Sequence, residues 1–514
     1  MRFQDDGDLL FVEKITGFNT HAPDAGKRGL LELLEAQTGR KLFVVHRLDK
    51  ETSGAMVFAQ SKEAAADMAA LFEKHLVRKR YLLLTDRRRS EETFTAASRI
   101  EKKGASFVSD PNSKDPNSRT LFRKLKSLKI GDLWEALPET GKPHQIRLHA
   151  TDRGIPILGD AEHGGSPFAR LCLHSKFLGF NWRGAEKTFE ASTPAWSNDL
   201  EAPQAQFLDA VQSRSHLFDL SRFGDECLRL AHQELAFCRV DQFGPQLWVY
   251  WYAEADPSAD FLKFLALVSQ TAKKSIFVRH MHNRGRDPNR QDAWLIGDVQ
   301  DVWQARENGV RFELRTDSGQ SPGLFLDQRE NRRWVRRNSG DRKVLNLFSY
   351  TGGFSVNAAL GGADEVCTVD VSGKFNDWTM RNFEINSLDP RQPLKYEFWN
   401  QDCLLFLKGA AKRGRKWDLI ICDPPSFGRS KEGTFQIQRQ LPPLLDLCLS
   451  CLEKNGRLLF SSNYEGWTLE DLRQQILVNR STHQIAIEPT PPASLDFERP
   501  DTEPLMKSLI LVKR

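Results

Sequence analysis

The sequence predicts a multidomain protein in which an α+β domain with a mixed or antiparallel sheet precedes an α/β domain. Three observations predict this. The chain has 514 residues, more than one ordinary domain contains. Residues 1–205 hold short strand-like runs broken by Gly, Pro, Asn and Asp. From residue 306 onward, apolar runs alternate with amphipathic segments, as in a parallel sheet covered by helices.

We expect three domains, at 1–205, 206–305 and 306–514, since polar residues and prolines cluster in STPAWSNDLEAPQAQ near the first boundary. The clearest helix of the first domain is KEAAADMAALFEKH (62–75). In the small central domain, the helical pattern ADFLKFLALVSQTAKK lies between the strand-like runs LWVYWYA and SIFVRHM. The third domain supplies VLNLF, EVCTVDV, WDLIICD and GRLLFSS, which have the composition of strands buried on both faces.

The basic residues are clustered. The net charge is only +5, but Lys and Arg gather in five runs, which are RKR (78–80), RRR (87–89), RKLKSLK (123–129), RENRRWVRR (329–337) and KRGRK (412–416). Any one run could be ordinary solvated surface. Five together favour a polyanionic partner, and we expect RNA.

The cysteines and the hydropathy exclude other classes. Cys448 and Cys451 form a CxxC, but it lies in the apolar helical pattern LLDLCLSCLEKNG and predicts core packing, not a zinc or redox site. The sequence lacks a run of eighteen apolar residues, and the acidic start MRFQDDGDLL lacks the apolar stretch of a signal peptide. We therefore expect a reduced, cytoplasmic protein that enters no membrane and needs no metal.

The first candidate site is the stretch HRLDKETSG (46–54), in which Asp49 lies in a turn between two apolar runs. Aspartate is common in turns, so this position alone says little. Three further stretches add weight, namely RKRYLLL (78–84), TGKPHQIRLHA (140–150) and RLCLHSKFLGF (170–180). The second of these alternates, with His144, Ile146 and Leu148 on one face and Gln145, Arg147 and His149 on the other.

This set resembles the RluA-type pseudouridine synthases. Their motifs HRLDxxTSG, a basic strand with Tyr, GRxHQIRxH followed by GxPIxGD, and RLxLHA occur here in the same order. The resemblance implies an α+β synthase domain that isomerises uridine to pseudouridine. It implies that Asp49 is the catalytic aspartate and that Tyr81 stacks on the target base. It further implies that Arg147 pairs with the aspartate and that Arg47 holds the place of the flipped nucleotide.

Elementary chemistry agrees with these roles. Detaching uracil and rejoining it through carbon 5 needs one ionised carboxylate, which a neighbouring arginine would keep charged. Whether it acts as nucleophile or base stays open. Two departures from the family affect substrate contacts, since Lys142 and Pro143 replace Arg and Thr, and His163-Gly164 replaces Tyr-Gly.

The second candidate site begins at VLNLFSYTGGFSVNAALGG (344–362), which predicts a strand, a glycine-containing turn and a helix. Asp370 ends the next strand and could bind ribose hydroxyls. Asp402 is placed to meet an adenine amine, and Asp423 ends a further strand before Pro-Pro. All lie at carboxyl ends of strands, where open α/β sheets bind ligands. The turn lacks a Walker lysine, which disfavours a triphosphate.

These residues resemble the class I S-adenosylmethionine (SAM) methyltransferases, and more narrowly the large-subunit ribosomal RNA methyltransferases with a DPPxF motif. The matching stretches are GLFLDQR (323–329), LNLFSYTGGFS (345–355), VDVS (369–372), NFEIN (382–386) and DPPSFGRSK (423–431). The resemblance implies a Rossmann-like α/β domain that takes SAM as cofactor and ribosomal RNA as partner. It implies that the cofactor is lined by Phe348, Tyr350, Thr351 and Gly352, that Asp370 takes its ribose and Asp402 its adenine, and that Asp423 closes the site.

Two branches of these methyltransferases share the motifs. Methylation of cytosine carbon 5 needs a cysteine nucleophile, which that branch keeps after the strand that GRLLFSS (456–462) matches, where this chain has Ser461, Ser462 and Asn463. Cys422 precedes Asp423 and fits a buried strand. Guanine N7 has its own lone pair, and FSSNYEGW resembles the guanine-N7 branch. We therefore favour guanine N7 over cytosine C5, and over an exocyclic amine, because Ser426 separates Pro425 from the aromatic Phe427.

The sequence thus predicts a fusion of a pseudouridine synthase and an rRNA methyltransferase. Two alternatives stay open. The synthase-like domain could be a non-catalytic module that docks RNA for the methyltransferase, or one half could be degenerate and only grip RNA.

Overall fold

A computed structural model of the chain describes residues 3–22, 29–218, 224–281, 292–319, 321–392, 394–430, 433–480, 483–497 and 504–514. It divides into two compact units. Unit 1 comprises Met1–Phe223, Leu230–Val240 and Tyr250–Val268, and unit 2 comprises Gly224–Arg229, Asp241–Val249 and Ser269–Arg514. The predicted boundary at 205 falls within helix α4 (Ala202–Leu217). The three-domain division stays a prediction.

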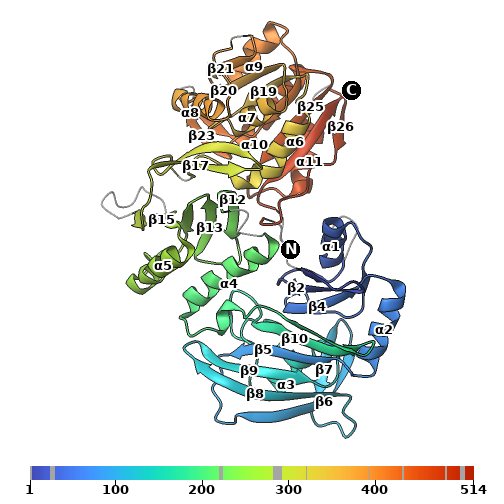
Figure 1. Cartoon of the computed structure of the whole chain (residues 1–514). Helices are drawn as coiled ribbons and strands as arrows, with labels where there is room; N and C mark the ends of the chain where they lie inside the picture. The colour runs from blue at the N-terminus through green and yellow to red at the C-terminus, as the bar shows by residue number, and fades with distance from the viewer. Residues whose placement is uncertain are drawn as a thin grey trace. The chain divides into compact units, whose positions relative to one another are not determined.

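Unit 1 is built on an eleven-stranded sheet (Figure 1). Its order is β1 (Phe3–Asp5), β2 (Leu9–Lys14), β4 (Ser53–Ala59), β10 (Leu173–Trp182), β5 (Arg78–Thr85), β9 (Gly131–Pro138), β8 (Ser118–Leu128), β6 (Thr93–Lys103) and β7 (Ser106–Asp110), with β3 (Phe43–Val44) on β4 and β11 (Ala185–Glu190) on β10. Strands β4 and β10 are parallel, and the other neighbours in this described sheet are antiparallel. The predicted mixed or antiparallel sheet is confirmed.

The helices described up to residue 218 are α1 (Leu30–Thr38), α2 (Lys62–Glu73), α3 (Gln145–Asp152), α4 and the short η1 (Ala195–Ser197). Helix α2 confirms the pattern at 62–75. It begins at Ser61, whose side chain accepts a hydrogen bond from Ala64 N, and it buries Ala64 and Met68, which are one turn apart.

The two-face alternation expected along 140–150 is wrong, because this stretch forms helix α3. Its residues 145–150 are all buried, whatever their polarity. The polar ones have buried partners. Gln145 Nε2 donates to Thr120 Oγ1 at 2.9 Å, and His149 Nδ1 lies 2.9 Å from the same hydroxyl. A helix that is buried on every side has no single apolar stripe. The hydrophobic residues of this segment therefore do not recur at the spacing that predicts a helix.

A five-stranded sheet follows in the sequence. Its strands are paired in chain order, namely β12 (Cys227–Ala231), β13 (Cys238–Phe243), β14 (Gln246–Trp251), β15 (Ser275–His280) and β16 (Ala293–Ile296). Helix α5 (Ala259–Ala272) separates β14 from β15, as expected. The hairpin of β17 (Val302–Glu307) and β18 (Val310–Arg315) follows.

The seven-stranded sheet of unit 2 has the order β21 (Tyr396–Asn400), β20 (Glu365–Asp370), β19 (Lys343–Leu347), β22 (Trp417–Cys422), β25 (Leu452–Ser462), β27 (Lys507–Lys513) and β26 (Ile485–Glu488). The first five strands are parallel, and β27 runs antiparallel to both of its neighbours. The predicted α/β fold with a parallel sheet is therefore confirmed.

Helices cover both faces of this sheet. On one face lie α6 (Arg329–Arg337), α7 (Gly353–Leu360) and α8 (Gly373–Glu384), and on the other lie α9 (Cys403–Lys412), α10 (Ile437–Ser450) and α11 (Leu469–Asn479). The short η2 (Leu326–Gln328) precedes α6, and the hairpin of β23 (Phe427–Ser430) and β24 (Gly433–Gln436) follows β22. Cys448 lies in α10 and Cys451 caps it, both buried and free, so the core interpretation of the CxxC holds.

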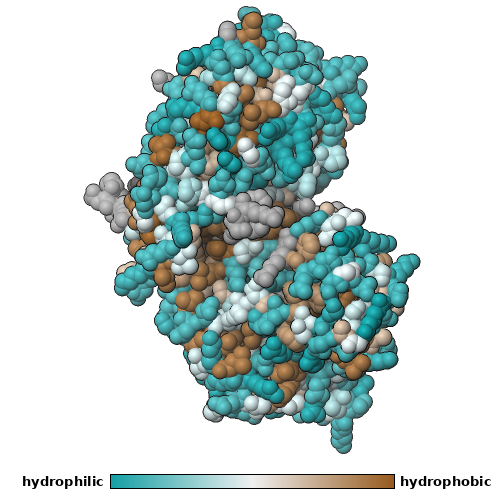
Figure 2. Space-filling model, viewed as in Figure 1, coloured by the Kyte–Doolittle hydropathy of each residue, from teal (hydrophilic) through white to brown (hydrophobic). Residues whose placement is uncertain are grey.

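The surface differs in composition from the apolar cores. Hydrophilic residues dominate the face of each unit that Figure 2 shows. In the described part of the chain, no helix is both long and apolar enough to cross a membrane.

Candidate active sites

The turn that carries Asp49 lies between β3 and β4. Its backbone closes when Thr52 N donates to Asp49 O at 3.1 Å. Gly54, the second residue of β4, has φ 111°, and a Cβ at this position would come within 2.2 Å of Ser175 O on β10. Only glycine fits there, which gives the last letter of the HRLDKETSG motif its physical reason.

Arg147 approaches the turn from α3. Its Nη1 lies 3.7 Å from Asp49 Oδ2, so the structure brings the two predicted residues together as an ion pair without a hydrogen bond. The guanidinium is held elsewhere. It makes a bidentate contact with Asp160, at 2.8 Å and 2.6 Å, and donates to Glu162 at 2.7 Å. Burial alone would lower the pKa of Arg147, but its hydrogen bonds to Asp160 and the nearby carboxylates raise it.

Asp160 is a further residue of this candidate site. It ends the stretch that matches the family pattern GxPIxGD, to which no role was assigned from the sequence. It is buried, and Gly159 before it has φ 83° with no room for a Cβ, which would lie 2.0 Å from Arg170 O. Gly159 and Asp160 therefore position the guanidinium group of Arg147 beside Asp49.

Tyr81 and Arg47 complete the predicted set. Tyr81 lies on β5 and is half-buried. Burial raises the pKa of Tyr81 to about 12; Ser175 opposes this shift and the charge of Asp49 adds to it, so the phenol is neutral near pH 7. Arg47 is exposed, and it forms no ion pair with any residue that the structure describes. It is free to contact a polyanion.

Lys14, at the end of β2, is a residue that sequence reasoning missed. Its ammonium is fully buried and donates to Lys50 O and Thr52 O, each at 2.7 Å, and to Ile15 O at 3.1 Å. It thus holds the backbone that follows Asp49. Burial lowers the pKa of Lys14 to about 7, against the charges of Glu51 and Asp49. A signal existed, since the apolar run LLFV ends in two charged residues, Glu13 and Lys14, at the end of a strand.

One cluster beside Arg147 could hold a metal ion. His144 Nδ1 lies 3.0 Å from His163 Nε2, and their metal-ligating atoms and those of Glu162 lie within 4.8 Å of one another. The positive charge of Arg147, bonded to Glu162, disfavours a cation there. His163 is one of the two departures from the family's pattern noted above.

The second site lies at the carboxyl end of β19. Phe348 and Tyr350 follow this strand with φ 54° and φ 50°, in the left-handed region that side chains disfavour. Gly352 has φ 76°, and a Cβ there would lie 2.2 Å from Thr379 Cγ2. Thr351 Oγ1 donates to Gly323 O at 2.5 Å. Two strained residues and a glycine therefore shape a tight turn before α7.

The predicted aspartates line the same edge of the sheet. Asp370 ends β20, where its Oδ2 accepts from Tyr350 N and its Oδ1 from Ser372 N, both at 2.9 Å. Burial raises its pKa. Asp402 follows β21 and caps α9, because its Oδ1 accepts from Leu404 N and Leu405 N. No hydrogen bond from the described residues reaches its Oδ2.

A carboxylate pair faces this edge from β22 and η2. Burial and the neighbouring Asp327 raise the pKa of Asp423 to about 7. Asp327 Oδ1 is buried and accepts no hydrogen bond from the described residues, and burial raises its pKa as well. Neither carboxylate forms an ion pair with a described residue, although the charge of Arg332 lowers the pKa of both. The pair therefore suits a positively charged ligand such as the sulfonium of SAM. The sequence reasoning quoted Asp327 in GLFLDQR without a role. Lys431, the last residue of DPPSFGRSK, lies outside the described residues.

Comparisons with known proteins match each site to a family. Residues 8–152 match the family of RNA pseudouridylate synthases, and residues 262–464 match the S-adenosylmethionine-dependent methyltransferases. The chain joins a pseudouridylate synthase domain to a SAM-dependent methyltransferase domain. S-adenosylmethionine is the cofactor of the methyltransferase domain, as the sequence predicted, and both fold classes are confirmed.

Individual relatives resemble the methyltransferase domain. The ribosomal RNA large subunit methyltransferase K of Neisseria meningitidis serogroup B is 36% identical over 230 residues, 44% of this chain and 62% of that protein. The methyltransferase K/L of Shewanella sp. ANA-3 is 44% identical over 160 residues, 30% of this chain and 22% of that protein. The chain thus spans less than two thirds of either relative. The crystal structure of a putative methyltransferase complexed with SAH covers 70% of this chain and 89% of its own, with 20% identity and a TM-score of 0.51, which supports the fold.

Proposed function

We propose that the chain is a bifunctional RNA-modifying enzyme. Its synthase domain isomerises uridine to pseudouridine, and its methyltransferase domain methylates large-subunit ribosomal RNA at guanine N7. The observation that carries the first activity is the Asp49–Arg147 pair at 3.7 Å, on a turn braced by Lys14. The observation that carries the second is the row of Asp370, Asp402 and Asp423 at one sheet edge.

In the synthase domain, the proposed roles follow from position. A uridine within a helix must leave the stack, which costs on the order of a few kcal/mol. Arg47, exposed beside Asp49, takes the place of the flipped nucleotide, and the ring of Tyr81 stacks on the uracil. The Asp49 carboxylate acts at the sugar, as nucleophile or as base. Arg147 stabilises its charge without binding it directly, so the carboxylate stays free to react.

In the methyltransferase domain, bound SAM supplies an electrophilic methyl group. Phe348, Tyr350, Thr351 and Gly352 form the wall against the cofactor, Asp370 accepts hydrogen bonds from ribose hydroxyls, and Asp402 Oδ2 accepts one from the adenine amine. Asp423 and Asp327 offer negative charge to the cationic end. The neighbouring Ser426, whose hydroxyl donates to Asn463 Oδ1 at 2.8 Å, joins the DPPSF turn to the strand end where the base would lie.

The choice of guanine N7 rests on the cysteines. Addition to cytosine carbon 6 needs a thiolate in the pocket. All eight cysteines are described, and all are buried. Burial raises the pKa of Cys422 well above its usual value, next to Cys448. Guanine N7 needs only alignment of its lone pair with the methyl group, which these residues can provide. The relatives named above as large-subunit rRNA methyltransferases favour the same substrate class.

The rival function, a methyltransferase whose synthase-like domain only docks RNA, is favoured by the altered Lys142-Pro143. Mass spectrometry of ribosomal RNA from cells with and without the gene separates the two. We expect one pseudouridine and one 7-methylguanine to disappear together. Loss of the methylated guanine alone would support the docking alternative, and loss of a 5-methylcytosine would replace the guanine assignment.

A further inference from the structure

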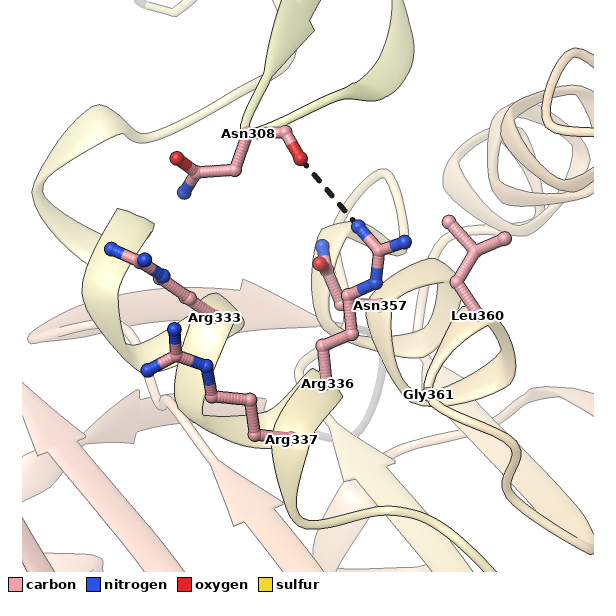
Figure 3. A pocket seen from close by; sticks show the side chains of 7 residues that line it. All are labelled: Asn308, Arg333, Arg336, Arg337, Asn357, Leu360 and Gly361. Carbon is pink, nitrogen blue, oxygen red and sulfur yellow. Dashed lines mark hydrogen bonds between the residues drawn. The ribbon is translucent and has the colours of Figure 1, made fainter.

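One cavity in unit 2 lies apart from the residues of the candidate cofactor site. It measures about 500 Å³ and is lined by Asn308, Arg333, Arg336, Arg337, Asn357, Leu360 and Gly361 (Figure 3). We call it the arginine pocket. Its walls are α6, the last turn of α7 and the turn between β17 and β18. A volume of this size suits a small ligand or a phosphate with its water shell.

The arginines of α6 divide into two groups. Arg332 makes a bidentate contact with Glu307, at 2.6 Å on both arms, and Arg329 pairs with Asp496 at 2.9 Å. These two are buried and neutralised. The three arginines of the pocket are not. Arg333 approaches Glu330 only to 3.7 Å, with 47% of its side chain exposed.

The other two arginines of the pocket have no acidic partner. Neither Arg336 nor Arg337 forms an ion pair with any residue in the described ranges of the chain. Arg336 Nη1 donates only a long bond, 3.5 Å, to Asn308 O, as the dashed line of Figure 3 shows. Their forked donors therefore line a cavity and lack an acidic acceptor among the described residues.

The local charge balance favours an anion. Cations at the end of α6 also complement its helix dipole, which is the ordinary explanation for such residues. The carboxyl-terminal ends of α6 and α7 contribute about −0.5 charge each. Glu330 adds one further negative charge. Three guanidinium groups exceed this sum and leave a net charge of about +1, with planar forks that match phosphate.

The position of the pocket relates it to the cofactor site through one rigid element. Helix α7 begins at Gly353, directly after Gly352 of the candidate cofactor turn, and ends at Leu360, which lines the pocket. Eight residues of helix span about 12 Å. The arginine pocket therefore lies at the carboxyl end of α7, on the face of the sheet that α7 covers. The candidate cofactor turn is at the other end of this helix, so the pocket is separate from the site of methyl transfer.

We propose that the arginine pocket binds a backbone phosphate of the RNA whose base enters the methyltransferase site. This inference rests on the proposed function, because it takes RNA as the substrate. One phosphate contact contributes about 0.7–0.9 to the slope of log affinity against log salt. The phosphate contact therefore accounts for a factor of roughly five to eight in the fall of RNA affinity between 0.1 M and 1 M salt.

The test uses the full chain and a naked large-subunit rRNA transcript, with binding measured at several salt concentrations. The variant Arg333→Gln/Arg337→Gln removes the two exposed charges of the pocket. The control Arg391→Gln/Arg473→Gln removes the same charge from α8's following loop and from α11, where the arginines pair with Glu384 and Glu470. We expect the pocket variant to lose about 0.7–0.9 of the slope and the control to keep it.

A second variant separates charge from shape. Arg333→Lys/Arg337→Lys keeps both charges, so its salt slope should equal that of the unaltered chain. Its affinity for RNA should be lower, because lysine lacks the forked donors of the guanidinium group. SAM affinity, measured by calorimetry, should be unchanged in all three variants. Equal salt slopes in the pocket variant and the control, with RNA binding intact, would overturn the proposal that the arginine pocket binds RNA. The arginines would then be assigned to contact with an acidic protein surface. An unaltered chain that binds no RNA would overturn the proposed function together with the pocket.

Discussion

Asp49 reacts, in our proposal, because its surroundings leave it charged and unbound. Arg147 is committed to Asp160 and Glu162, so it supplies positive charge at 3.7 Å without occupying the Asp49 oxygens. Glutamine or asparagine at this position would have the shape but neither the charge nor the nucleophilicity.

We therefore predict that Asp49→Asn abolishes pseudouridine formation and leaves methyl transfer unchanged. The measurement is pseudouridine and methylguanine in a large-subunit rRNA transcript incubated with the purified variant. Asp115→Asn, which changes a carboxylate with 88% of its side chain exposed in the same domain, serves as the matched control. Pseudouridine made at the normal rate by Asp49→Asn would refute the assignment.

In the proposed cofactor site, Asp423 should make the affinity for SAM depend on pH. Its pKa is raised to about 7, so below that pH the carboxyl of the free enzyme is protonated and neutral. A cationic ligand prefers the ionised form. We predict that SAM affinity rises as the pH increases from 6 to about 7.5 and then levels off. SAH, which lacks the sulfonium charge, should show a weaker rise, and Asp423→Asn should flatten the SAM curve. A SAM affinity independent of pH in the unaltered enzyme would contradict this role.

At the scale of single elements, the turn between β19 and α7 concentrates backbone strain. Phe348 and Tyr350 occupy the left-handed region, and Gly352 leaves no space for a side chain. Such strain persists only where the surrounding structure enforces it.

We predict that Gly352→Ala weakens SAM binding at least tenfold, because its Cβ would meet Thr379 at 2.2 Å and its φ is 76°. Gly340→Ala is the control, since a Cβ there would come no closer than 3.5 Å to Gly361 O. Calorimetric titration of SAM into both variants measures the two affinities. Equal affinities would show that the turn adjusts without cost.

The elements that the sequence predicted well are those with a clear period. The strands β19, β20 and β22 and the helices α2 and α5 were all visible as apolar runs or stripes. Helix α3 was not, because it is buried all round and its polar residues serve internal partners. Lys14, Asp160 and Asp327 were missed for a related reason. Each acts on a neighbour distant in sequence, and only the folded chain brings them together.

On the scale of the whole molecule, the described residues of each candidate site belong to one unit. Lys14, Tyr81 and Arg147, which surround Asp49, belong to unit 1, and Asp370, Asp402 and Asp423 belong to unit 2. Neither site borrows a described residue from the other unit.

We predict that the two activities are separable in the intact chain. SAM should bind with a stoichiometry of one per chain. Asp370→Ala should weaken this binding and abolish methylation, while pseudouridine formation continues at the unaltered rate. Calorimetry and nucleoside mass spectrometry on the same preparation test this. Simultaneous loss of both modifications in a folded Asp370→Ala chain would mean that the activities are coupled.

The buried ammonium of Lys14 couples folding of unit 1 to proton release. In the unfolded chain a lysine keeps its proton up to a pKa of about 10.4, whereas in the folded chain the pKa of Lys14 is about 7. Between these values the unfolded state binds more protons, so the free energy of unfolding gains a contribution that rises with pH. Hydrogen exchange of the β2 and β4 amides at pH 7 and pH 9 should report this rise, and Lys14→Met should remove it. The lysine that braces the Asp49 turn would then also make this unit more stable in mildly alkaline than in neutral solution.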